Sequence, residues 1–217
     1  WEWILPNMKG IAKRACIKEP KIDEGNELMR EYIYNYLMTI DSLFGNKATY
    51  AEVIEDYIDM PSWAAQWLIF EISGTTEPNG PSSWFTYKNK NDNKWYCGPT
   101  WDFDHKSYIP TTCNKWINAN FIYIPMMLQY PPFKEELLKK WGILEPLLPE
   151  LIEFIKSERE RLHKSAELNW TIHEPNLMDD NRVENGDEFL SSNTAIDVMI
   201  DYLEKKWEFI SNNIGKL

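Results

Sequence analysis

Two carboxylates placed two positions apart are the clearest chemical signal in this sequence. Asp102 and Asp104 end the segment Gly-Pro-Thr-Trp-Asp-Phe-Asp at 98–104. In extended backbone these two side chains project to one face, while Trp101 and Phe103 project to the other. Mg²⁺ or Mn²⁺ binds through one or two carboxylates, keeps bound waters and is completed by substrate phosphates. The spacing therefore predicts a site for a hard cation at the two aspartates.

The same pair also has a plainer interpretation. Asp-x-Asp sequences are common, and most of them are solvated or cap a following turn. His105, directly after the pair, is either a metal ligand or base, or an ordinary surface residue in a polar turn. Spacing alone does not separate these alternatives, so the neighbouring segments have to be considered.

A loop and a hairpin precede the aspartates. Residues 75–83 read TTEPNGPSS, and the prolines and glycine predict a loop that offers four polar side chains: Glu77, Asn79, Ser82 and Ser83. Aromatic runs at 84–88 and 94–97, separated by NKNDN, predict a β-hairpin with a loop of about five residues. A hairpin brings its two ends together, so the loop and the aspartates are expected to face one cleft. Asn79 is then either a second metal ligand or a turn residue before Gly80.

Helical periodicity covers most of the remaining chain. Apolar residues at three- and four-residue spacings predict helices over about 24–44, 50–57, 119–129, 133–141, 147–168 and 192–213. A further helix is expected between an Asp59 cap and a stop at Gly74, with Pro61 in its first turn and Trp63, Trp67 and Phe70 on its buried face. The acidic stretch 178–187 is expected to be a surface loop. The predicted fold class is α+β, mainly α-helical with a central β-hairpin, as a single domain over 1–217.

Composition argues against several classes of protein. The 217 residues are 43% hydrophobic and 14% aromatic, enough for a sizeable core, and no apolar run approaches the roughly 18 residues that span a bilayer. The net charge of −11, spread along the chain, argues against a nucleic-acid partner. Cys16, Cys97 and Cys113 form no Cys-x-x-Cys pattern. The chain starts at Trp1 with no export signal, and we expect a mature, truncated or proteolysed form.

Three segments, in order and spacing, resemble the CotH kinase family of spore-coat and other exported bacterial proteins. They are the stretch from Tyr57 to Glu71, EPNGPSSWFTYK at 77–88 and GPTWDFD at 98–104. The resemblance implies an atypical protein-kinase-like fold that transfers phosphate from ATP to a protein hydroxyl, with Mg²⁺ or Mn²⁺ as the metal. It also implies an extracellular or cell-envelope location.

The resemblance assigns roles to individual residues. Asp102 is similar to the family's metal-binding aspartate, and Asp104 is its neighbour or a second ligand. The family's catalytic aspartate precedes this box, and the nearest match here is Glu77 to Asn79, where no aspartate stands. We expect Glu77 to act as the base for the acceptor hydroxyl, or Asn79 to orient it. The nucleotide-binding lysine of the family lies in a preceding N-terminal lobe, so the chain is expected to be the C-terminal part of a larger domain.

Two functions without catalysis stay open. One is an inactive, pseudokinase-like or cell-surface binding module, in which an aromatic surface binds a protein or a glycan through Trp84, Trp95, Trp101 and Trp116. The other is a purely structural protein, in which the Trp and Tyr residues simply fill the core. An exposed aromatic patch would favour the first, and a buried Asp102 segment that only caps backbone amides would favour the second.

Overall fold

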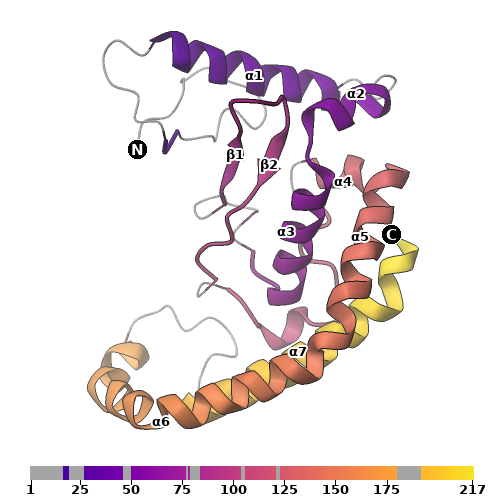
Figure 1. The fold of residues 1–217 in the computed structure, drawn as a ribbon. Helices are drawn as coiled ribbons and strands as arrows, with labels where there is room; N and C mark the ends of the chain where they lie inside the picture. The colour runs from indigo at the N-terminus through magenta and orange to yellow at the C-terminus, as the bar shows by residue number, and fades with distance from the viewer. Residues whose placement is uncertain are drawn as a thin grey trace.

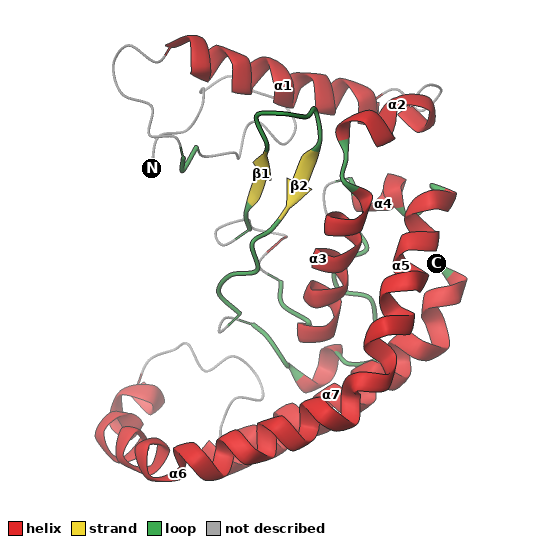
Figure 2. Ribbon diagram, in the orientation of Figure 1, coloured by secondary structure: helices red, strands yellow, loops and turns green. Residues whose placement is uncertain are grey.

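The computed structural model describes residues 17–19, 27–45, 50–76, 78, 84–103, 106–120, 123–179 and 192–217. Within these ranges the chain is mainly helical around one antiparallel hairpin, which confirms the predicted fold class (Figure 2). The α-helices are α1 (Glu27–Gly45), α2 (Tyr50–Tyr57), α3 (Met60–Ser73), α4 (Ile124–Met127), α5 (Pro131–Leu144), α6 (Leu148–Asp179) and α7 (Ser192–Asn213). The strands are β1 (Thr86–Lys88) and β2 (Trp95–Cys97), and the 3-10 helices are η3 (Pro110–Thr112), η4 (Glu145–Leu147) and η5 (Ile214–Lys216).

Helix α3 forms the centre of the core, with β2, α5 and α7 packed against it (Figure 1). Its sequence is apolar on nearly every side, as is typical of a buried helix. Trp63, Trp67 and Phe70 are buried, as their spacing predicted. The Trp63 indole donates to the Trp95 carbonyl at 3.0 Å and the Trp67 indole to the Asn118 carbonyl at 3.2 Å, so both polar atoms are satisfied inside the core.

Both ends of α3 are fixed by the residues that the sequence indicated. Asp59 Oδ1 accepts a hydrogen bond from the Ser62 N–H at 2.9 Å, and Pro61 lies in the first turn. Gly74 adopts φ 66°, and its N–H donates to the carbonyls of Phe70 and Glu71. This left-handed stop is one that glycine adopts without steric cost. The predicted cap and stop are therefore confirmed.

Removing the Asp59 cap gives a first testable prediction. Asp59→Ala leaves the Ser62 N–H without its side-chain acceptor and is expected to lower the free energy of unfolding by about 1 kcal/mol. Urea unfolding followed by circular dichroism measures the change. Asp56→Ala, at an exposed carboxylate on α2, is the matched control and is expected to stay within about 0.5 kcal/mol of the parent chain. Equal losses for the two variants would contradict the capping role.

The hairpin pairs Thr86 with Cys97, Tyr87 with Tyr96 and Lys88 with Trp95. Its loop spans 89–94, one residue more than predicted, because Asp92 Oδ1 accepts from the Lys94 N–H and keeps Lys94 in the turn. Helix α1 lies over the tip of this loop, where the Tyr36 hydroxyl donates to the Asn93 carbonyl at 2.6 Å (Figure 1). The hairpin is thus held between α1 and α3.

The C-terminal half matches its prediction in part. Helix α7 has the predicted bounds, whereas α6 continues past the predicted end to Asp179, and 180–191 lies outside the described residues. The prediction of a helix over 119–129 is wrong in its extent, since the structure has α4 there, and the chain just before it bonds Glu71 through the amides of Ile117 and Asn118. Among the described helices, none combines the length and apolar character needed to cross a membrane.

Candidate functional site

The backbone at Asp102 is not extended, so the predicted alternation of faces is wrong at this point. Asp102 has φ 63°, in the left-handed region, and its side chain is exposed. Aspartate tolerates this conformation better than most residues, because its short side chain can bond locally. The chain therefore turns at Asp102 and presents this carboxylate on the outside of the bend. Asp104 and His105 lie outside the described residues.

Aromatic contacts hold the turn on both sides of Asp102. The ring of Trp101 meets Phe85 edge-on at 6.2 Å between centroids, and the ring of Phe103 lies 5.9 Å from that of Phe70 on α3. Phe103 is half-buried, whereas Trp101 stays largely exposed. The turn is thus attached to the hairpin before Asp102 and to α3 after it.

The chain returns to the end of α3 directly after the turn. The Tyr108 N–H donates to the Ser73 carbonyl at 2.7 Å, and the Tyr108 ring packs edge-on against Tyr202 of α7. Lys106 and Tyr108 also have positive φ angles, of 54° and 59°. Such angles are unfavourable for these residue types and persist where tertiary contacts fix them. Phe103 and Tyr108 are therefore held by their contacts with α3 and α7.

The chain that leads to Glu77 is fastened at the same end of α3. The Asn118 side-chain amide, fully buried, donates to the Thr75 carbonyl at 3.0 Å and to the Phe70 carbonyl at 3.4 Å. The Thr75 N–H donates to Ser73 Oγ at 3.4 Å. Glu77 and Asn79 follow within four positions of Thr75 but lie outside the described residues. The chain before Glu77 and the chain around Asp102 therefore both contact one structural anchor, the last turn of α3.

A buried ion pair supports this anchor, and the sequence analysis did not predict it. Glu71 and Lys206 have no exposed side-chain surface, and Lys206 Nζ lies 3.1 Å from Glu71 Oε2. Glu71 also accepts from the N–H groups of Ile117 and Asn118, and Lys206 donates to the Lys115 carbonyl at 2.7 Å. Burial lowers the pKa of Lys206, against the opposing effect of Glu71. The available signal was Glu71 itself, the one charged residue of α3.

The four tryptophans proposed as a binding surface occupy different environments. Trp95 is buried, Trp84 and Trp116 are half-buried against the core, and only Trp101, at 62% exposure, lies on the surface. Tyr87 on β1 is 47% exposed. Near the candidate site, therefore, Trp101 and Tyr87 are exposed, and the other three tryptophans serve the core; elsewhere among the described residues Tyr32 of α1 and Phe154 of α6 are also exposed.

Asp102 has chemistry that fits Mg²⁺ or Mn²⁺, because it is an exposed carboxylate oxygen donor. In the part of the chain that the structure describes, no group of three or more His, Cys, Asp or Glu side chains gathers to hold a metal ion. A kinase-type cation uses one or two carboxylates and takes its other ligands from phosphates and water. Asp102 would supply one of these carboxylates, and Asp104 is the candidate for the second.

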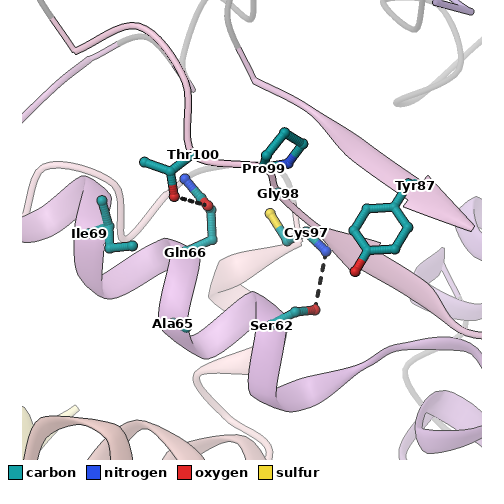
Figure 3. A pocket seen from close by; sticks show the side chains of 9 residues that line it. All are labelled: Ser62, Ala65, Gln66, Ile69, Tyr87, Cys97, Gly98, Pro99 and Thr100. Atoms are coloured by element: carbon teal, nitrogen blue, oxygen red, sulfur yellow. Dashed lines mark hydrogen bonds between the residues drawn. The ribbon is translucent and has the colours of Figure 1, made fainter. Parts of the chain in front are cut away.

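A groove of about 350 Å³ lies beside the turn, between α3 and the chain leaving β2 (Figure 3). Its walls are Ser62, Ala65, Gln66 and Ile69 of α3, Tyr87 of β1, and the stretch 97–100. Burial raises the pKa of the Cys97 thiol to about 12, so this wall residue is a neutral, apolar surface rather than a nucleophile. The groove ends at Thr100, two residues before Asp102.

Comparison of the chain with models of protein families, with curated proteins and with solved structures found no match.

Proposed function

We propose that this chain carries the C-terminal part of a CotH-like atypical protein kinase, which in the intact parent transfers phosphate from ATP to a protein hydroxyl. Asp102 and Asp104 hold Mg²⁺ or Mn²⁺, and Glu77 or Asn79 positions the acceptor. An N-terminal lobe of the parent holds the nucleotide. The proposal includes an extracellular or cell-envelope location, by resemblance to exported members of the family.

One observation carries this proposal: the chain to Glu77 and the turn at Asp102 are fastened to the same end of α3. Ser73 accepts from Tyr108 through its carbonyl and from Thr75 through its hydroxyl, and Phe70 contacts Phe103 through its ring. Phosphoryl transfer depends mainly on positioning and on charge neutralisation. A common anchor for the acceptor-positioning and metal-binding segments supports that requirement.

The proposed reaction assigns a separate task to each segment. The acceptor oxygen forms a bond to the γ-phosphorus while the bond from that phosphorus to the β–γ bridging oxygen breaks, and ADP leaves. Glu77 takes the acceptor's proton if it is the base, whereas Asn79 only orients the hydroxyl. The divalent ion, when bound, neutralises charge on the phosphate oxygens. Asp102 holds its carboxylate outward from a turn that Phe70 and Phe85 fix through Phe103 and Trp101.

A non-catalytic binding module is the second candidate, and the exposed aromatic residues favour it. Trp101, which follows the stretch 97–100, and Tyr87 of β1 both keep large rings in solvent. Exposed aromatic side chains are frequent anchors in protein and glycan recognition. In this alternative the fold is retained and Glu77, in place of an aspartate, marks the loss of catalysis.

Titration calorimetry with Mg-ATP separates the two candidates. The samples are this chain, the full-length parent, and the parent with Asp102→Ala. We expect the parent to bind Mg-ATP, Asp102→Ala to weaken binding at least about tenfold through loss of a metal ligand, and this chain alone not to bind.

The matched control is Asp56→Ala in the parent, which removes an exposed carboxylate on α2 and is expected to leave binding unchanged. A parent that ignores nucleotide in the presence of either metal would rule out the kinase proposal. In that case the binding-module function would be preferred.

A further inference from the structure

The groove beside Asp102 follows the direction of α3. The Cys97 N–H donates to Ser62 Oγ at 3.1 Å, the Thr100 hydroxyl lies 3.1 Å from Gln66 Oε1, and Phe103 reaches Phe70. The two walls therefore run side by side, as Figure 3 shows for the stretch from Ser62 and Cys97 to Ile69 and Thr100. Seven helical steps of about 1.5 Å give a floor of about 10 Å, which suits about three residues of extended peptide.

Gln66 gives the groove a polar contact. The side chain is only 5% exposed, and its Oε1 accepts from the Thr100 hydroxyl. Its amide nitrogen has no hydrogen-bond partner among the described residues, although Gln66 lines the groove. This nitrogen is not fully buried, so it is open to the groove, where an acceptor on a ligand can replace water. A carbonyl oxygen of a ligand in the groove would accept this hydrogen bond.

The other lining groups favour a peptide over a sugar. The side chains of Ala65, Ile69 and Pro99 are apolar. The Ser62 hydroxyl is already used, since it donates to the Asp59 carbonyl and accepts from the Cys97 N–H. The exposed Tyr87 ring at the rim suits a peptide or a sugar, but the hydroxyls of a sugar would also require polar partners that Ala65, Ile69 and Pro99 do not provide. An extended peptide requires a donor for a carbonyl and an apolar surface for one side chain. The groove offers both.

We propose that this groove binds a short extended polypeptide segment, with a backbone carbonyl accepting from Gln66 Nε2 and an aliphatic side chain against Ala65, Ile69 and Pro99. The segment belongs to the acceptor protein and flanks the hydroxyl to be phosphorylated, because the groove ends two residues from Asp102. This assignment of the ligand as an acceptor rests on the proposed function. Peptide binding itself does not.

Fluorescence anisotropy of this chain with pools of labelled nonapeptides tests the proposal, without ATP or metal. Each pool carries a central serine and one flanking position fixed as Leu, Asp, Lys or Gly. We expect Leu-fixed pools to bind best. Gln66→Met, which keeps the shape but removes the donor, is expected to weaken binding about three- to tenfold. Ile69→Asp is expected to abolish it, because an aliphatic side chain would then face a carboxylate.

Ile143→Asp is the matched control, since Ile143 is 59% exposed on α5, away from the groove, and its replacement is expected to leave binding unchanged. Tyr87→Ala, at the exposed rim, replaces Ile69→Asp if the latter unfolds, and is expected to weaken binding several-fold. The proposal is overturned if no pool binds, if Gln66→Met and Tyr87→Ala bind like the parent chain, or if cellohexaose, maltohexaose or chitohexaose binds more tightly. Because the assay omits ATP, peptide binding by a parent that ignores nucleotide would refute only the kinase proposal.

Discussion

Replacing Lys206 by methionine is expected to lower the free energy of unfolding by about 3–5 kcal/mol, because it leaves the Glu71 carboxylate buried without its cation. Methionine keeps much of the length and apolar character of the lysine side chain. The decrease in the free energy of unfolding therefore measures the missing charge rather than a change in packing. Chemical unfolding followed by tryptophan fluorescence measures it.

Lys206→Met is also expected to loosen the hydrogen bonds that hold the chain near the candidate site. Glu71 accepts from the N–H groups of Ile117 and Asn118, and Asn118 in turn holds the Thr75 carbonyl. Movement of the unpaired carboxylate would loosen these amides. Hydrogen exchange is therefore expected to be faster at Ile117 and Asn118 in the variant than in the parent chain.

Lys205→Met is the control for this experiment. Lys205 is the exposed neighbour on α7, where it pairs with Asp201 at 2.7 Å, and exposed pairs contribute little. The double variant Glu71→Gln, Lys206→Met keeps an oxygen acceptor for the amides without a buried charge, and is expected to be more stable than Lys206→Met alone. If Lys206→Met and Lys205→Met were equally stable, the ion pair would have no structural role.

Gly74→Ala is expected to lower the free energy of unfolding by about 2–5 kcal/mol, the sum of two separate effects. Gly74 has φ 66°, which is unfavourable for alanine by about 1–2 kcal/mol. A Cβ at this position would also lie 2.2 Å from the Tyr202 hydroxyl oxygen and 3.0 Å from Thr112 Oγ1, and overpacking of this kind adds about 1–3 kcal/mol. Thermal and urea unfolding measure the sum.

Two further variants, Gly142→Ala and Tyr202→Phe, separate the backbone effect from the packing effect. Gly142→Ala lies inside α5 with open space around the new Cβ, and is expected to be neutral or to stabilise by up to about 1 kcal/mol. In a Tyr202→Phe background the 2.2 Å contact is gone, so the destabilisation by Gly74→Ala is expected to be smaller, with the backbone part and the tight contacts to Thr112 Oγ1 and the ring at residue 202 remaining. The same loss in both backgrounds would show that the contact with Tyr202 is unimportant.

Local signals in the sequence were sufficient for the boundaries of α3 and α7. Asp59, Pro61 and Gly74 act within one turn of the residues they cap or stop, so they predicted α3 correctly. The periodicity of 192–213 likewise predicted α7, whose apolar face packs on one side of the core. Such features depend on neighbours three or four positions away, which a sequence displays directly.

The site depends on contacts that no local pattern contains. Asp102 was expected in extended backbone, yet the contacts of Trp101 with Phe85 and of Phe103 with Phe70 bend the chain there. The helix expected over 119–129 is reduced to α4, and Ile117 and Asn118 just before the expected start donate their amides to Glu71. At both places the chain makes contacts with distant residues that the local pattern does not contain. Gln66 is another example, since its role depends on a groove formed with the stretch 97–100.

Glu71 and Lys206 are 135 positions apart in the sequence, and this separation affects folding during synthesis. The ribosome completes α3 long before α7, so Glu71 has no cation partner while the core is only partly assembled. The C-terminal end of α3 can reach its final arrangement only after α7 has been synthesised and has docked, 135 positions later in the chain. Nascent chains that have not yet released α7 should therefore be the species that depend most on chaperones.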